Sequence, residues 1–334
     1  MSRRILPTAA ALVALGIVVG VSAQSQPLKL VSTEWPPFTN PTGQPRFALD
    51  LVEAALGRID IASTTAIVAP AQFTPAVLSN TFDGSGAAWR DAERDKALLF
   101  SQPYLENRLV VVARKGTDVS ATALPSLKGK RIAIVEGYAY GDIDSAGPTF
   151  VRAAGDEASL TELLQGKVDY TLMDELVVEY LVSAYPKESQ DRLAIGKNAV
   201  LKRPLFFALR RSYPNAASII SRFNAQLRNM IVDRTYHRLL HVDWIRADID
   251  GDGVPEYIPA SDKVGPTPPS HAYSLFTPES SQSSRLKVVE VSPRFYLGGT
   301  VYSDWATVPD PFKAFDTNRP DPSRSTASIF KFKW

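Results

Sequence analysis

The chain contains no cysteine among its 334 residues. This absence excludes a disulfide framework, a metal site built on thiolates and a cysteine nucleophile. It also excludes a lipid anchor attached to a cysteine at a signal cleavage site. The sequence has no G-x-S-x-G, P-loop or dinucleotide-binding pattern, so these signatures of hydrolases and nucleotide-binding proteins are missing as well.

An excess of one charge sign is also missing. The 37 basic and 35 acidic residues give a formal net charge of +2. This balance provides no electrostatic attraction for nucleic acid or for an anionic membrane surface. With 45% hydrophobic residues the chain can bury a sizeable core, and its length favours two domains over one. We therefore expect a globular protein with no nucleic-acid partner.

Only one stretch is apolar enough to concern a membrane, and it lies at the N-terminus. Arg3 and Arg4 precede an apolar run that ends in a small-x-small cleavage pattern, Val21-Ser22-Ala23. The run is shorter than the ~20 residues of a membrane span. We predict a signal peptide over residues 1–23 and an exported, periplasmic mature chain with no stable membrane insertion. A retained N-terminal anchor is the alternative.

From residue 28 to about 242, strand-like and helix-like segments alternate. The strand-like runs are short and apolar, whereas the helix-like runs repeat apolar residues at a spacing of three to four. Such alternation predicts an α/β fold with mostly parallel sheets. The expected strands span 28–32, 108–114, 131–137, 168–175 and 205–211, and the expected helices span 47–59, 159–166 (with Gly166 as its C-cap) and 216–231.

Beyond this alternating part the pattern changes. An acidic segment, 248–256, precedes a stretch rich in Pro and Ser over 259–284. Two strand-like runs, 285–291 and 294–305, follow before the C-terminal tail. We expect residues 243–334 to form a C-terminal extension of mostly loop and short β strands.

A set of motifs in a fixed order links the alternating part to a known family. Glu93-Arg94 is followed six residues later by Phe100-Ser101, then by Pro103-Tyr104 and a β-branched strand. Over residues 28–242 the chain resembles the amino-acid-type (family 3) periplasmic solute-binding proteins of ABC importers. Three further segments match this family in order: 126–141, 159–182 and 212–240.

The resemblance implies a two-lobe periplasmic-binding-protein fold of type II, in which two crossovers join the lobes. Carried onto this chain, the first lobe spans 28–113 and 205–242, and the second spans 118–200. Ligand binds in the cleft between the lobes, which close by a hinge motion. The extension over 243–334 lies outside the family. The expected partners are a small-molecule ligand and an ABC permease, and a monomer is expected.

The resemblance also implies how the ligand is held. Arg94 corresponds to the family's clamp for the ligand's α-carboxylate, to which a guanidinium can donate two parallel hydrogen bonds. Asp174 corresponds to the acid that receives the α-ammonium group. From the residues alone, Arg94 could instead pair with Asp91 or Glu93, and Asp174 could cap the helix that follows it.

Other candidate ligand-binding residues depart from the family's pattern. Trp35 follows the first strand, where open α/β sheets bind ligands, and could stack on a ligand. The positions five and seven residues before Arg94, which are small or hydroxyl residues in the family, hold Trp89 and Ala87. We therefore expect an aromatic or acidic amino acid, or an organic acid with no amine. The loop of the second lobe completes the expected set with Tyr138, Ala139 and Tyr140.

The acidic segment 248–256 resembles a calcium-binding loop. Clustered carboxylates repel one another unless a hard cation neutralises them, and Gly253 allows the sharp turn at position 6. Pro259 stands where an EF-hand has Glu, so the loop is more similar to shorter, repeat-type sites. No cofactor is required, but a structural Ca²⁺ is a candidate, and a solvated acidic turn is the alternative. The candidate ligands are Asp248, Asp250, Asp252, the Val254 carbonyl and Glu256.

Together these features predict an extracytoplasmic receptor that performs no catalysis. It captures a small carboxylate-bearing ligand, expected to be an amino acid, and delivers it to an ABC importer. One alternative is an enzyme, because cyclohexadienyl dehydratases resemble the same fold and Asp174 or Glu175 could supply the proton. The other alternative is an accessory protein whose C-terminal extension docks onto a partner complex or sensor.

Overall fold

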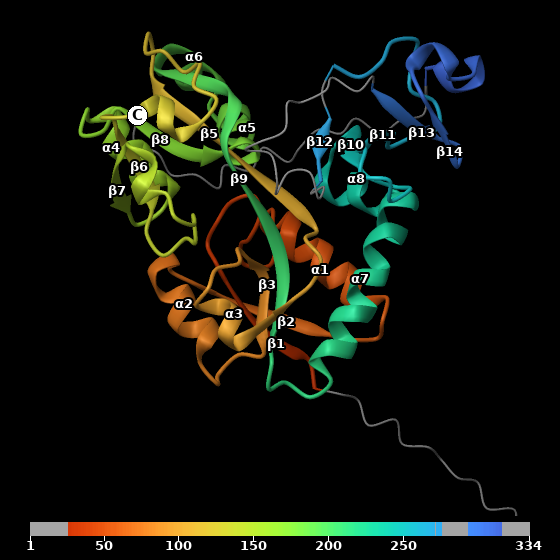
Figure 1. Cartoon of the computed structure of the whole chain (residues 1–334), viewed down its shortest axis with the longest axis horizontal. Coiled ribbons are helices and arrows are strands. Elements are labelled where there is room, and N and C mark those ends of the chain that lie inside the picture. Colours follow the sequence, from red (N-terminus) through yellow and green to blue (C-terminus); the bar gives the residue numbers. More distant parts are fainter. Residues whose placement is uncertain (1–25, 271, 276–292, 316–334) are drawn as a thin grey trace, which may run out of the picture.

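The computed structural model describes residues 26–270, 272–275 and 293–315, and it shows two α/β lobes joined by a pair of long strands (Figure 1). The C-terminal part forms a smaller body of short strands beside the lobes. The predicted fold class, a two-lobe α/β fold with a C-terminal extension of loops and short strands, is confirmed.

The first lobe is built mainly from the N-terminal part of the chain. Its strands β1 (Leu28–Thr33) and β2 (Ser63–Val68) pair in parallel over their whole length. Helix α7 (Ala216–Val232) buries one apolar face, as its residue spacing predicted. The other elements of this lobe are β3 (Gly84–Ala88), β4 (Leu98–Phe100), α1 (Phe47–Gly57), α2 (Pro70–Leu78), α3 (Arg94–Ala97) and α8 (Thr235–Leu240).

The second lobe is continuous in sequence. Its helix α4 (Asp156–Leu164) ends just before Gly166, whose φ of +75° suits the left-handed position after a helix, as predicted. Strand β8 (Tyr170–Asp174) leads directly into helix α5 (Glu175–Ala184). The other elements are β6 (Arg131–Val135), β7 (Thr149–Ala153), α6 (Pro186–Arg192) and two 3₁₀ helices, Leu124–Leu127 and Asp144–Ala146.

Two long antiparallel strands, β5 (Leu105–Arg114) and β9 (Leu193–Arg210), run through both lobes. At one end β9 pairs with β3 and β4 of the first lobe, and at the other end β5 pairs with β8 of the second. The sheet order is therefore β2-β1-β3-β9-β5-β8-β6-β7, with β4 attached to β9. A change in lobe orientation must bend this pair of strands.

The joining strands differ from the sequence prediction in length. The strand expected at 205–211 begins at Leu193, because residues 193–204 already pair with β5. These residues mix lysine, asparagine and proline with apolar residues, so no continuous apolar run marks them as a strand. β5 pairs with β8 from Leu109 onward, a few residues before the lobe boundary expected at 113.

The described part of the extension forms its own sheet, ordered β12-β10-β11-β13-β14. The ring nitrogen Nε2 of His237, in α8, lies 2.9 Å from the Ile258 carbonyl oxygen and ties this sheet to the first lobe. The strands are β10 (Trp244–Ala247), β11 (Glu256–Pro259), β12 (Tyr273–Ser274), β13 (Arg294–Leu297) and β14 (Thr300–Tyr302), followed by 3₁₀ turns at Trp305–Thr307 and Asp310–Lys313.

Two predictions concern segments outside the described residues: the signal peptide over 1–23 and the strand-like run at 285–291. Among the helices of the described part, none is both long and apolar enough to cross a membrane.

Candidate functional site

A small cavity lies between the two lobes. It brings together six of the eight residues expected to bind ligand, whereas Tyr140 and Asp174 are not among its lining residues. The lining consists of Thr33, Trp35, Phe73, Ala87, Trp89, Arg94, Gly137, Tyr138, Ala139 and Leu205.

The topology explains why residues far apart in sequence meet here. Trp35 follows the carboxyl end of β1, and Trp89 follows the carboxyl end of β3. Tyr138 follows the carboxyl end of β6 in the other lobe. Chain segments that leave strand ends in open α/β sheets gather in the crevice beside them, which is the usual place for a ligand. The cavity is therefore a candidate ligand site by position.

Arg94 is the charged residue of this cavity, and its side chain is almost fully buried, with 2% exposure. Its Nη1 donates to the Trp89 carbonyl at 2.8 Å, and its Nη2 donates to Thr74 Oγ1 at 2.7 Å and to the Gly137 carbonyl at 3.3 Å. Its Nε lies 3.4 Å from a carboxylate oxygen of Asp91. Burial lowers the pKa of Arg94, and the charge of Asp91 opposes this shift.

Both interpretations of Arg94 thus have a counterpart in the structure. The ion pair with Asp91 exists, but it engages only Nε at a long distance. The two terminal nitrogens instead meet neutral oxygens, one of which, the Gly137 carbonyl, comes from the opposite lobe. A guanidinium in this environment can exchange a carbonyl for a carboxylate when the lobes move apart.

Aromatic rings from both lobes fill most of the cleft. The ring centres of Trp35 and Trp89 are 5.6 Å apart, and that of Tyr138 lies 5.4 Å from each of them, all in edge-to-face geometry. Tyr140 packs on the outside of this group, 5.3 Å from Trp89. The remaining cavity is about 30 Å³, room for about one or two water molecules. A larger solute therefore requires the lobes to part and the rings to move.

The two lobes are in close contact beside Arg94. Gly137 has φ of +81°, and a Cβ atom placed on it would lie 2.5 Å from the carbonyl oxygen of Pro70, at the start of α2. Only a glycine allows this approach without a shift of the backbone. Thr33 of the first lobe and Tyr138 of the second also line the same cavity. The described conformation is therefore closed.

Asp174 is held outside the cavity by backbone donors. Its Oδ1 accepts from the Leu176 amide at 2.8 Å and its Oδ2 accepts from the Arg108 amide at 3.0 Å. It is the N-cap of α5, so the helix-cap interpretation describes its position. Burial raises the pKa of Asp174 to about 8, although these hydrogen bonds lower it. Contact between Asp174 and a ligand stays a prediction.

Several lining residues were not predicted from the sequence. Thr33 lies at the end of β1, two residues before Trp35, and could have been found from that position. Phe73 lies on α2, and its ring faces the Arg94 guanidinium at 5.0 Å. Gly137 could not be singled out, because its role depends on the approach of α2 from the other lobe.

A second cavity, of about 290 Å³, is lined by residues of both lobes. Its acidic lining residues are Glu34 of the first lobe and Asp156 and Glu157 at the start of α4. Burial raises the pKa of Asp156 to about 7, and the charge of Glu157 adds to this shift.

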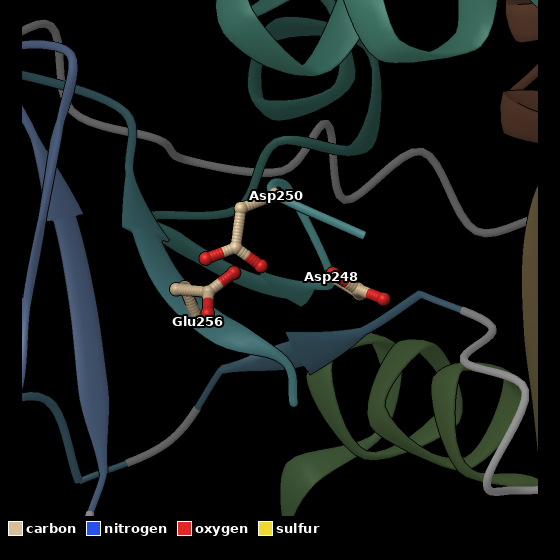
Figure 2. Close-up of side chains that lie close together, drawn as sticks. All are labelled: Asp248, Asp250 and Glu256. Carbon is tan, nitrogen blue, oxygen red and sulfur yellow. The ribbon is translucent and has the colours of Figure 1, made fainter. Parts of the chain in front are cut away.

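The acidic segment 248–256 forms the loop between β10 and β11. Oxygen atoms of Asp248, Asp250 and Glu256 lie within 4.8 Å of one another, and Figure 2 shows the carboxylates of Asp250 and Glu256 facing each other. The loop backbone folds onto its own side chains: Asp248 accepts from the Gly251 and Gly253 amides at 2.6 and 2.9 Å.

A guanidinium from β13 lies among these carboxylates. Arg294 reaches Asp250 at 2.6 Å, Asp252 at 2.5 Å and Glu256 at 3.1 Å. Glu256, with 0% exposure, also accepts from the Ile249 amide at 3.0 Å. Three of the five candidate ligands, Asp248, Asp250 and Glu256, thus lie close together, and Arg294 already meets two of these and Asp252. Calcium binding by this loop stays a prediction.

Solved structures similar to this chain share its lobes. The GluR0 ligand-binding core in complex with L-glutamate has a TM-score of 0.56 at 19% identity, over 65% of this chain and 99% of that one. An ancestral arginine-binding protein bound to arginine has a TM-score of 0.53 at 24% identity, over 65% and 97%. An arginine transport-system periplasmic binding protein from Legionella pneumophila has 0.53 at 21%, over 64% and 97%. These likenesses support the fold.

A comparison with curated protein sequences gave no match. The sequence profile of the bacterial extracellular solute-binding proteins, family 3, matches residues 17–246, which include both lobes and the cleft. The match ends where the C-terminal sheet begins, as expected for an extension outside the family. The chain therefore belongs to the bacterial extracellular solute-binding proteins, family 3.

Proposed function

We propose that this protein is an extracytoplasmic receptor that captures a small carboxylate-bearing solute between its lobes at Arg94. The observation that carries the proposal is the buried guanidinium whose Nη2 meets the Gly137 carbonyl of the opposite lobe at 3.3 Å. A solute carboxylate would take the place of this carbonyl with stronger, charge-assisted hydrogen bonds. The same contact would then link solute capture to lobe closure.

The proposal includes delivery of the solute to an ABC permease by a monomeric protein. Family membership supports a solute-binding role, and the periplasmic location follows from the N-terminal export signal predicted over residues 1–23. The closed lobes would present one joint surface to the permease, whereas open lobes would not. In this scheme the C-terminal sheet is an addition to the receptor.

The geometry favours a receptor over a dehydratase. A dehydratase needs an acid in the cleft that can donate a proton to the leaving group. Asp174, with its pKa raised to about 8, has the right protonation state, but both of its oxygens accept backbone hydrogen bonds and it does not line the cavity. Glu175 pairs with Arg108 at 2.9 Å.

The proposal is tested by thermal unfolding of the chain without residues 1–23 in the presence of amino acids and organic acids. A solute that binds the folded state raises Tm, by the equivalent of about 2.7 kcal/mol at one hundred times its Kd. We expect stabilisation by at least one carboxylate. A panel without any stabilising carboxylate contradicts the receptor, and turnover of prephenate or arogenate favours the enzyme.

A further inference from the structure

We infer that the cleft selects carboxylate-bearing solutes that carry no α-ammonium group. This inference deepens the proposed function and rests on it, because it concerns the solute of the same cleft. In an α-amino acid one carbon atom separates the carboxylate from the ammonium group. Both groups must therefore fit in the same cavity when the carboxylate binds Arg94.

The charges at the cavity favour an anion alone. Of its ten lining residues, Arg94 is the one that is ionised at neutral pH. A second guanidinium, that of Arg203, lies over the Trp89 ring, 5.8 Å from its centre. Asp91 meets the Nε of Arg94 and is not a lining residue. An ammonium here would be desolvated beside cations and without a carboxylate partner, which is unfavourable.

The acid expected to receive an ammonium is committed elsewhere. Asp174 accepts the Leu176 and Arg108 amides with its two oxygens and lies outside the lining. Burial also raises its pKa to about 8, which disfavours the ionised form at neutral pH. Pairing with an ammonium ion would have to offset this cost of ionisation as well as replace the amide donors.

The aromatic rings do not replace this missing acid. A ring face can attract an ammonium ion when it is open to it. Here the face of Phe73 lies under Arg94 at 5.0 Å, and Arg203 lies over Trp89. Trp35 and Tyr138 pack edge to face on each other and on Trp89. In the closed form these ring faces thus contact the protein's own cations and rings, and the rings provide apolar walls for the rest of an organic acid.

Three acids of the second cavity concern only amines that lie away from the α position of a solute. Glu34, Asp156 and Glu157 line the neighbouring cavity and not the one at Arg94. They are candidate partners for an amine farther along a long solute. The selection therefore applies to the α position.

Matched pairs of solutes test the inference by isothermal titration. Each pair differs only in the α-amino group: L-phenylalanine and 3-phenylpropanoate, L-leucine and 4-methylpentanoate, L-glutamate and glutarate. We expect the amine-free member of the binding pair to have a Kd at least about tenfold lower, because it leaves no unpaired ammonium in the cleft. Arg94→Ala should abolish binding of this member.

A new acid in the cavity wall gives a second test. Ala87→Asp would supply the missing carboxylate, with Ala87→Asn as the neutral control of similar size. We expect Ala87→Asp, but not Ala87→Asn, to shift the preference toward the amino acid by about tenfold or more.

The outcomes separate the two proposals. If the amino acid of a pair binds the wild-type chain more tightly, the selection is wrong while the receptor stands. If no carboxylate binds in titration or in the thermal screen, the receptor fails and the selection fails with it. Weak, equal binding of both members, unchanged in Ala87→Asp, also contradicts the selection.

Discussion

Two arginines of this protein, Arg94 in the cleft and Arg294 in the C-terminal sheet, lie among oxygen atoms of different kinds. Arg94 donates to two backbone carbonyls and a threonine hydroxyl, and meets one carboxylate at 3.4 Å. Arg294 meets three carboxylates between 2.5 and 3.1 Å. Dipoles thus make most of the contacts of one guanidinium, and full charges make those of the other.

The Arg94 site can therefore accept an anion from a solute, whereas the Arg294 site already contains its own counter-ions. Carbonyl and hydroxyl oxygens carry only partial charges, and the Asp91 carboxylate meets Arg94 at 3.4 Å through Nε, so the two terminal nitrogens of Arg94 still lack an anionic partner among the described residues. The carboxylates around Arg294 already neutralise it and gain a cation in return. The two sites should therefore respond in opposite ways to removal of the arginine: one in solute affinity, the other in stability.

The largest effect is expected for Arg94→Ala. Loss of the charge partner of the bound carboxylate should cost about 2–5 kcal/mol of binding free energy, at least about 30-fold in Kd. Titration with whichever carboxylate stabilises the wild-type chain measures this. Arg90→Ala is the matched control, because Arg90 is exposed and pairs with Asp95, outside the cavity. Similar Kd values for both variants would remove Arg94 from the solute site.

Arg294→Met should leave solute binding unchanged and lower Tm by roughly 5 °C or more. The variant deprives Glu256, which has 0% exposure, of its cation, and an unpaired buried charge is strongly destabilising. Lys313→Met is the control in the same C-terminal extension, since its pair with Asp310 spans 3.9 Å and Asp310 is fully exposed. A Tm equal to that of the control would mean that the carboxylates of the loop need no counter-ion.

Addition of Ca²⁺ tests whether another cation can take the place of Arg294 in the acidic loop. We propose that Ca²⁺ and Arg294 compete for the oxygens of Asp250, Asp252 and Glu256, so millimolar Ca²⁺ should raise the Tm of Arg294→Met by several degrees and that of the wild-type chain by less. Unchanged Tm values in both chains, with EDTA as the reference, would leave the loop as an acidic turn closed by Arg294.

The surroundings of Arg94 could be predicted from the sequence, whereas those of Arg294 could not. Trp35 and Tyr138 each follow a predicted strand, and strand ends in α/β sheets share one crevice. Trp89 was assigned by its place in the family motif, because the strand before it, β3, was not predicted. Arg294 lies far along the chain from the acidic loop, and it reaches the loop because β13 pairs with β11. No local pattern reports such a pairing, so the calcium-loop prediction missed the internal cation.

Asp174 and β9 also depend on pairing between strands that are distant in sequence, which no local pattern reveals. The end of β8 was predicted, but the amide that occupies one oxygen of Asp174 belongs to Arg108, on a strand paired across the sheet. The first half of β9 was missed because its residues are held by pairing with β5 and not by an apolar pattern. One-faced helices such as α7 were predicted well, since burial of one face leaves a periodic signal.

Gly137→Ala should hold the lobes apart, because its Cβ would lie 2.5 Å from the Pro70 carbonyl. We expect a larger radius of gyration in X-ray scattering and an affinity lowered by about tenfold. Gly129→Ala is the matched control: its φ of +77° imposes the same backbone strain, of about 1 kcal/mol, but a Cβ there meets nothing within 4 Å. Equal scattering from the two variants would show that this contact does not govern closure and that Arg94 keeps its partner from the opposite lobe.

The smallest effect is expected for Asp174, the acid near the cleft, and it concerns how the unfolding free energy depends on pH. With its pKa raised by burial to about 8, Asp174 keeps its proton in the folded state at pH values where the unfolded chain has lost it. Its contribution to stability is therefore complete at acidic pH and falls as pH rises toward 8, by up to about 1.4 kcal/mol per pH unit.

Asp174→Asn should flatten the dependence of the unfolding free energy on pH, measured in urea between pH 5.5 and 7.5. The new amide group beside the Arg108 amide adds a constant offset, which does not change this slope. Asp156, whose pKa is also raised, is present in both chains, so its contribution cancels in the difference. Equal slopes would mean that Asp174 is ionised at neutral pH. The cleft would then have a carboxylate nearby, as the Arg294 site has, and an α-ammonium group could pair with it.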